Sequence, residues 1–327
     1  MPDIVTFGEA MIRLAAPGFR RLEQATTLDL TVGGAELNVA CGAARLGLSA
    51  RWVSALPDNA LGRIARNKAR EMNVDVSCVQ WDETTRMGLY FVEYGASPRP
   101  SSVLYDRKGS AISELLALSF NWPAILAGAR LFHTTGITTA LSDKTAQEVG
   151  SGLATARAAG IVTSYDLNFR GKLWTAAHAR AVQEPLMDLV DVLITTEEDA
   201  SVVFGIEGSD YRDVALKLAG RFGFKVVTIT IRGDHSVLRN SWTAIAYADG
   251  AWVDDKVYDI EVVDRVGGGD AYASGFLFGY LTGDLSRAVR YGNAFSALKQ
   301  SSFGDFNWAT LAETEAQVRG AGTRIVR

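Results

Sequence analysis

Val263-Asp264-Arg265-Val266-Gly267-Gly268-Gly269-Asp270-Ala271 places three consecutive glycines between a β-like run and a helical pattern of small, apolar residues. Without Cβ atoms, glycines let backbone amides approach an anion closely, and a helix that begins there adds its positive end. Asp270, in the first helical turn, faces the same spot and could take a proton from a hydroxyl group. The stretch therefore predicts a phosphate cradle at Gly267, Gly268 and Gly269 beside a catalytic carboxylate. The alternative is a tight turn whose acid only complements the helix dipole.

The glycine run matches neither of two common nucleotide-binding motifs. No lysine follows the glycines, as G-x-x-x-x-G-K-[ST] requires, and Tyr272 stands where the third glycine of G-x-G-x-x-G belongs. Walker-type NTPases and Rossmann dehydrogenases therefore lose support.

Composition favours an ordinary globular protein of 327 residues, with 48% hydrophobic and 21% charged residues. One large α/β domain over residues 1–327 is expected. The formal charge of −4 predicts neither nucleic acid nor an anionic membrane as a partner, so small molecules are expected. The two cysteines lack C-x-x-C spacing and the three histidines are scattered, which disfavours a zinc site. No signal-like segment or long apolar run is visible, so we expect a cytoplasmic protein.

The segment Val32 to Gly47 begins with two glycines and continues as a helix of small residues. Asn38 lies one turn after Gly34 on the same helical face, so a backbone glycine and a side-chain amide can contact one ligand. An asparagine at a helix start can equally satisfy loop backbone, and both interpretations stay open.

Two basic segments point to an acidic substrate. Tyr105-Asp106-Arg107-Lys108 sets an aromatic ring beside a guanidinium, which binds a carboxylate through two parallel hydrogen bonds. A solvated strand end is the alternative. Asp166, Asn168 and Arg170 follow an apolar strand at its carboxyl end, where α/β sheets place ligands. If the extended conformation persists, all three lie on one face.

The second half of the chain is expected to contain two further strands, each followed by a candidate nucleotide-binding segment. Thr196 is a plausible N-cap after the strand at residues 191–195, with three acids in the next turn, and capping alone accounts for this pattern. Lys225 to Ile231 is expected to be a strand that leads into Arg232-Gly233-Asp234-His235-Ser236. A hairpin is expected around Asp249-Gly250.

Asp264 to Asp270 resembles the second signature of the PfkB (ribokinase-like) sugar kinases, D-[TP]-x-G-A-G-D, from which Arg265 and Gly268 depart. Gly8-Glu9, the Gly33-Gly34-x-x-x-Asn38 block, Arg45-Leu46-Gly47 and Leu56 to Gly62 follow the N-terminal pattern of that family in order. The resemblance implies a three-layer α/β/α fold with a central, mostly parallel sheet. It also implies a small β-sheet lid from segments at about 10–32 and 86–110.

The segment around Tyr105 is similar to the YxRKGSA segment of 2-keto-3-deoxygluconate kinases. The resemblance implies ATP-dependent phosphorylation of the 6-hydroxyl of that sugar acid, with Asp270 as base. A fructokinase, a ribokinase or a non-catalytic sugar- or nucleotide-binding regulator are the alternatives. The implied substrate-binding residues are Gly33, Gly34, Asn38, Tyr90, Tyr105, Arg107, Asn168, Arg170 and Asp270.

The resemblance also implies Mg²⁺ and a nucleotide site, with a turn at Arg232-Gly233 near the nucleotide. Thr196 and Asp199 replace the Asn and Glu of the family's N-x-x-E motif, so Asp199 is the candidate metal ligand and Glu198 competes with it. Related kinases use a monovalent cation such as K⁺, and their lids often pair into homo-oligomers. The implied nucleotide-binding residues are Thr196, Arg232, Gly233, Gly267, Gly269 and Asn293.

Overall fold

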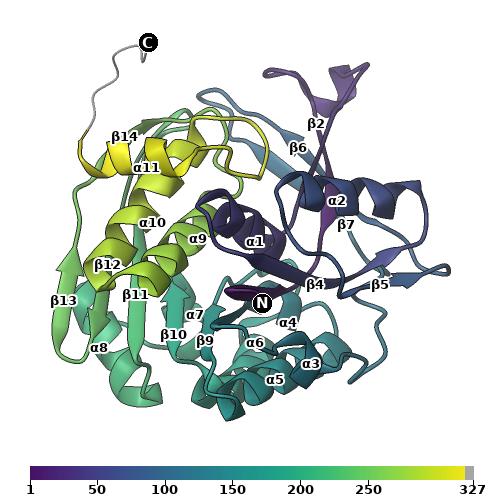
Figure 1. The fold of residues 1–327 in the computed structure, drawn as a ribbon. Coiled ribbons are helices and arrows are strands. Elements are labelled where there is room, and N and C mark those ends of the chain that lie inside the picture. The colour runs from purple at the N-terminus through teal and green to yellow at the C-terminus, as the bar shows by residue number, and fades with distance from the viewer. Residues whose placement is uncertain (321–327) are drawn as a thin grey trace.

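The computed structural model describes residues 1–320 and contains two β-sheets of different size (Figure 1). The large sheet has ten strands in the described chain. Nine of them follow one another across the sheet in the order β13 (Ala251–Asp254), β12 (Arg239–Ala248), β11 (Val226–Ser236), β10 (Val192–Thr195), β9 (Val162–Asp166), β8 (Leu131–Thr135), β1 (Ile4–Phe7), β4 (Ala50–Pro57) and β5 (Val79–Asp82). The tenth, β14 (Tyr258–Glu261), pairs with β12. Every pair from β5 to β11 is parallel, and the pairs beyond β11 are antiparallel. The expected three-layer fold with a mostly parallel sheet is confirmed.

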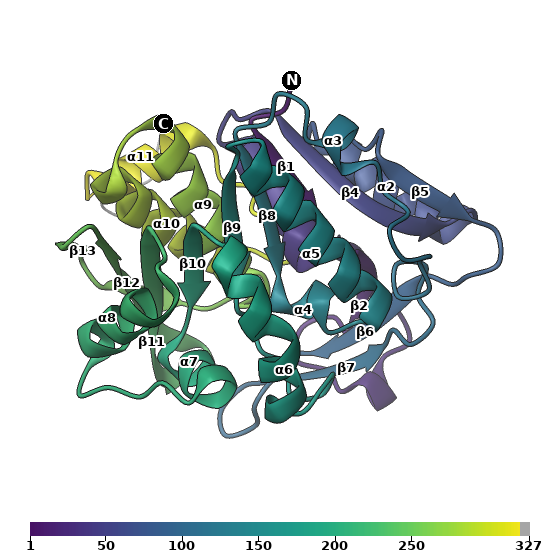
Figure 2. The ribbon, with the colours of Figure 1, turned by 90° about the horizontal axis from the view of Figure 1, so that it is seen from below.

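Helices cover both faces of this sheet, because its strands carry apolar side chains on both sides. Ile4 of β1 belongs to one hydrophobic cluster and Val5 and Phe7 to the other, as the alternation of side chains along a strand requires. The first cluster includes α1 (Ala35–Arg45), α9 (Gly268–Thr282) and α10 (Leu285–Gln300). The second includes α5 (Asp143–Ala158), α6 (Ala176–Gln183), α7 (Glu197–Phe204) and α8 (Tyr211–Phe222), and Figure 2 shows α5 lying along its face of the sheet.

Shorter or peripheral helices complete the described chain. They are η1 (Leu22–Gln24), α2 (Ala60–Glu71), α3 (Trp122–Ile125), α4 (Gly136–Thr139), η2 (Glu184–Leu189) and α11 (Leu311–Val318). Within residues 1–320, no helix combines the length and the apolar character that crossing a membrane would need.

The small sheet consists of β3 (Asp29–Gly33), β2 (Met11–Ala15), β6 (Gly88–Glu93) and β7 (Ser102–Asp106), in that order. Its strands come from the two segments expected to form a separate sheet, and β2 pairs in parallel with β6. In Figure 2 it lies beside α4, which follows the carboxyl end of β8. The inner face buries Met11, Arg13 and Ala15 of β2.

Two local expectations were wrong. Strand β9 ends at Asp166 and Asn168 has a φ of 38°, so extended alternation does not continue to Arg170. Arg232 and Gly233 form no turn, because β11 runs on to Ser236 and pairs with β12.

The hairpin at Asp249-Gly250 is confirmed, with positive φ angles of 48° and 81°. The single domain expected over residues 1–327 includes residues 321–327, which lie outside the described residues.

Candidate active site

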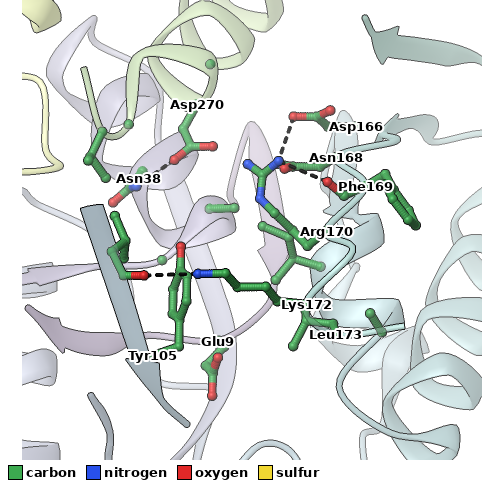
Figure 3. Close-up of a pocket in the computed structure, with 18 of the residues that line it drawn as sticks. Glu9, Asn38, Tyr105, Asp166, Asn168, Phe169, Arg170, Lys172, Leu173 and Asp270 are labelled. Atoms are coloured by element: carbon green, nitrogen blue, oxygen red, sulfur yellow. Dashed lines mark hydrogen bonds between the residues drawn. The ribbon is translucent and has the colours of Figure 1, made fainter. Parts of the chain in front are cut away.

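A cavity of about 1570 Å³ lies between the large sheet and the small sheet. Its walls include the loops that follow β9 and β10, the start of α1, the start of α9 and residues of β6 and β7. Figure 3 shows side chains from these elements pointing into one space. The large sheet therefore presents the carboxyl ends of its parallel strands to this cavity, where α/β proteins bind ligands.

The glycine loop forms one wall of the cavity. Gly267 caps α9 with a φ of 83°, and a Cβ there would lie 2.5 Å from the carbonyl oxygen of Asp305. Only glycine fits such a position without strain. Within residues 1–320 the amides of Gly267, Gly269 and Asp270 donate to no protein acceptor. Free amides at the start of a fifteen-residue helix form an anion-binding site.

Asp270 projects from the first turn of α9 and accepts a hydrogen bond from Asn38 Nδ2 at 2.6 Å (Figure 3). Asn38 reaches it because α1 packs closely on α9: a Cβ at Gly42 would lie 2.3 Å from Ser274 Oγ. Desolvation raises the pKa of Asp270 to about 6, with a further rise from the charge of Asp305, against the lowering effect of the Asn38 hydrogen bond. Asp270 is thus mostly ionised near neutral pH and is a competent proton acceptor.

Two more carboxylates lie across the cavity from the small sheet. Desolvation raises the pKa of Asp166 well above its ordinary value and that of Asp199 to about 6, and the charge of Arg170 opposes both shifts. The same guanidinium lowers the pKa of Asp270. Arg170, which is exposed, therefore lies where its charge acts on three carboxylates.

These acids fit Mg²⁺ held jointly with a phosphate. Among residues 1–320, no group of three or more His, Cys, Asp or Glu side chains is placed to hold a metal ion. Mg²⁺ commonly takes one or two carboxylates together with substrate phosphates and water. Asp199 and Asp166 provide such a set, because both line the cavity and the charge of Asp199 contributes to the raised pKa of Asp166. Glu198 also lines the cavity but is exposed.

The opposite end of the cavity is aromatic and basic. Tyr90 and Tyr105 stack with ring centroids 5.8 Å apart, and the Arg107 guanidinium lies 5.7 Å from the Tyr105 ring centre. Arg107 Nη2 donates to a carboxylate oxygen of Glu9, which also accepts from Ser110. This end suits a polar ligand that carries negative charge.

A buried ionic cluster links the small sheet to the glycine loop. Arg13 of β2 donates to Asp264 at 2.6 Å, to Asp305 at 2.7 Å and to Tyr94 at 2.6 Å, and it is almost fully buried. Tyr90 also donates to Asp305, at 2.6 Å. Because Asp264 and Asp305 flank the glycine loop, the position of the small sheet and that of the anion-binding amides depend on the same side chains.

The structure gathers most of the residues that the sequence predicted. The following residues line the cavity: Gly34, Asn38, Tyr90, Tyr105, Arg107, Asn168, Arg170, Thr196, Glu198, Asp199, Arg232, Gly267, Gly268, Gly269 and Asp270. Thr196 also caps α7, since its hydroxyl accepts from the Asp199 amide at 3.0 Å. Arg232 pairs with Asp234 at 3.3 Å.

Three predicted residues do not line the cavity. Gly33 lies behind it, where a Cβ would meet Asp305 at 2.2 Å. Gly233 lies within β11 against Ser241. Asn293 is fully buried in α10, where its amide donates to Asp255 at 3.3 Å.

Sequence reasoning missed Arg13, Lys172 and Asp305, and assigned no role to Glu9. Glu9 lies two residues after the end of the first strand, and this place at a strand's carboxyl end is a sequence signal for a ligand-binding residue. Nothing local marks Arg13 and Asp305, which are separated by 292 residues and meet only in the folded chain.

The comparisons with known proteins agree with this geometry. The family model of the pfkB family carbohydrate kinases matches residues 1–309. The chain belongs to this family. A 2-dehydro-3-deoxygalactonokinase of Haloferax volcanii is 39% identical over 330 residues and covers 99% of each chain. The crystal structure of 2-dehydro-3-deoxygluconokinase from Thermotoga maritima is 40% identical, covers 97% of this chain and 98% of that one, and has a TM-score of 0.94.

A more distant structure, that of a putative ribokinase II from E. coli, was solved in complex with ATP and Mg²⁺. It is 22% identical, covers 98% of this chain and 99% of its own, and has a TM-score of 0.85, which establishes a shared fold. This chain is therefore a carbohydrate kinase of the PfkB family with a ribokinase-like fold.

Proposed function

We propose that this kinase transfers the γ-phosphoryl group of ATP to the 6-hydroxyl of 2-keto-3-deoxygluconate. The observation that carries the proposal is the placement of Asp270: it lies at the start of α9 beside free amides and faces the same cavity as Tyr105 and Arg107. Two relatives described above, at 39% and 40% identity, are named as kinases of keto-deoxy sugar acids, which supports this class of substrate.

Asp270 would act as the base. It accepts the proton of the 6-hydroxyl as that oxygen forms its bond to the phosphorus and the bond to the ADP oxygen breaks. The amides of Gly267, Gly269 and Asp270 hold the oxygens of the transferred group, since they donate to no protein acceptor within the described chain. Asn38 fixes the carboxylate of Asp270. Such a transfer depends mainly on positioning and charge stabilisation.

Mg²⁺ supplies positive charge that neutralises the phosphate oxygens. Asp199 and Asp166 would hold it from the loops after β10 and β9. The charge of Arg170 acts on Asp166, Asp199 and Asp270, so we assign Arg170 to the transferred phosphoryl group and not to the acid end of the sugar, as the sequence had suggested. Thr196 and Arg232 would line the nucleotide part of the same cavity.

The sugar acid would lie under the small sheet. Gly34 lets the backbone approach closely there, because a Cβ would lie 2.0 Å from the Glu9 carbonyl oxygen. The stacked rings of Tyr90 and Tyr105 cover the carbon chain, and Arg107 faces the acid end. In this arrangement the small sheet acts as a lid.

A monovalent cation is a separate question. The carbonyl oxygen of Asp264, beside the glycine loop, accepts from the buried ammonium of Lys299 at 2.9 Å. A resident cation therefore already binds this loop. If turnover is equal in potassium and in tetramethylammonium buffers, the Lys299 ammonium takes the place of a monovalent cation at the glycine loop. If turnover depends on potassium, the loop requires a bound ion in addition.

The proposed function is tested by Mg·ATP-dependent ADP release with 2-keto-3-deoxygluconate, 2-keto-3-deoxygalactonate, gluconate, fructose and ribose. We expect turnover on the keto-deoxy acids, and loss of at least about a thousandfold in Asp270→Asn, as expected for removal of a general base. Near-wild-type activity of that variant would exclude Asp270 as the base. Preference for fructose or ribose would favour a neutral-sugar kinase, and ATP binding without turnover would favour a regulator.

We also propose that the chain forms a dimer through the outer face of its small sheet. Leu30, Leu14, Phe91 and Leu104 lie opposite one another across its four strands. Leu30 is 45% and Leu104 58% exposed, so the row is an apolar surface in the isolated chain. A second copy could bury this surface.

A further inference from the structure

Lys172 spans the mouth of the cavity from the large sheet to the small sheet. It lies in the loop between β9 and α6, and its ammonium donates to the carbonyl oxygen of Val103 on β7 at 3.1 Å. The same nitrogen lies 5.9 Å from the centre of the Tyr105 ring (Figure 3). The side chain is exposed to the cavity and was not among the residues that the sequence predicted.

At the end of the cavity beside Tyr105, the basic side chains differ in whether a protein carboxylate neutralises them. Glu9 neutralises Arg107, the basic residue that the sequence motif singles out. Arg170 lies at the other end, where its charge acts on Asp166, Asp199 and Asp270. Lys172 forms no ion pair within residues 1–320, so it contributes a positive charge that no protein carboxylate offsets.

We propose that Lys172 recognises the carboxylate of the sugar acid, which rests on the proposed function. An ammonium has three donors, and the bond to Val103 uses one, which leaves two for a carboxylate. The Tyr105 face favours a cation at this position. Arg107, held by Glu9, then orients Tyr105 and supplies a directed hydrogen bond, while Lys172 supplies the net charge that separates an acid from a neutral sugar.

The bond to Val103 gives this recognition a second consequence. Val103 belongs to the small sheet, and Lys172 to a loop of the large sheet. A carboxylate bound to Lys172 would hold the ammonium beside Tyr105 and keep β7 close to that loop. Binding of the acidic substrate and closure of the small sheet would therefore reinforce each other.

The test compares 2-keto-3-deoxygluconate with its neutral primary amide in the wild type, Lys172→Met and Lys172→Arg. A charge-assisted hydrogen bond predicts that Lys172→Met raises KM for the acid by about tenfold to a hundredfold and alters kcat by less than about threefold. Turnover of the amide should hardly change, so the preference for the acid collapses. Lys172→Arg keeps the charge and should restore most of that preference.

Lys144→Met is the matched control, because Lys144 is exposed on α5 and does not line the cavity. Its kinetics should equal those of the wild type with both compounds. If Lys172→Met lowers kcat/KM equally for acid and amide, Lys172 is only a structural tie and the inference fails. If the acid-to-amide ratio of Lys172→Met stays within twofold of the wild type, the inference fails while the proposed function stands. A wild type that turns over neutral sugars and no keto-deoxy acid overturns both.

Discussion

At the scale of single residues, the protonation of Asp270 controls the predicted chemistry. Desolvation raises the pKa of this carboxyl to about 6, and only the ionised form accepts a proton. We therefore expect kcat to be constant above about pH 7 and to fall about tenfold per pH unit below pH 6. Desolvation also raises the pKa of Asp199 to about 6, so the proposed metal role of Asp199 predicts a steeper acid limb. A pH–rate profile at saturating substrate measures this; a flat profile down to pH 5 would contradict the assignment.

Asp199 and Glu198 are adjacent acids that the structure separates. Asp199 is desolvated near Arg170, while Glu198 is exposed. Asp199→Asn should raise the Mg²⁺ concentration at half-maximal rate at least about tenfold, because a carboxylate ligand is lost. Glu198→Gln is the neighbouring control and should shift it less than about threefold. Both values come from titrating Mg²⁺ while ADP release is measured. A larger shift in Glu198→Gln than in Asp199→Asn would transfer the metal role to Glu198.

At the scale of elements, the start of α9 depends on the backbone of Gly267. Alanine there would adopt a φ of 83° and place its Cβ 2.5 Å from the Asp305 carbonyl oxygen. We expect Gly267→Ala to move the loop and lower kcat more than about tenfold. Gly223→Ala is the control, because its φ of 72° carries the same backbone strain of about 1 to 2 kcal/mol but no atom lies within 4 Å. Equal kcat values for the two variants would mean that the loop geometry is not required.

The contact between β2 and the glycine loop depends on the buried guanidinium of Arg13. Arg13→Met would leave Asp264 and Asp305 buried without their partner, which costs about 3 to 5 kcal/mol of unfolding free energy. Arg86→Met removes an exposed pair with Asp106 in the small sheet and should change stability little. Urea unfolding followed by fluorescence measures the difference. Similar midpoints for both variants would show that the buried cluster contributes no stability.

At the scale of the whole molecule, the apolar outer face of the small sheet predicts self-association. Leu104→Glu would place a charge in the proposed interface and should convert a dimer to a monomer in sedimentation velocity experiments. Leu216→Glu, at a residue 45% exposed on α8, is the control on a different surface. A wild-type chain that sediments as a monomer at all concentrations would refute the interface.

Local patterns predicted much of this protein. The glycine loop, its acid and the capped helix after β10 are recognisable because each needs only neighbouring residues to define its geometry. The same holds for the small-residue start of α1 and for the hairpin at Asp249-Gly250. The family resemblance added the two sheets, since its motifs recur in order along the chain.

Other features depend on residues that are distant in sequence. Arg232 and Gly233 extend a strand because β12 pairs with them, although the family resemblance implies a turn there. Glu9 cancels the charge of Arg107, and Lys172 reaches the small sheet, only because folding brings these segments together. Electrostatic attraction and backbone pairing depend on distance in space, whereas a motif records only separation along the chain. The chemistry of the glycine loop could therefore be inferred from the sequence alone. The net charge that the cavity presents to a substrate is set by tertiary contacts, because these decide which basic side chains are already paired.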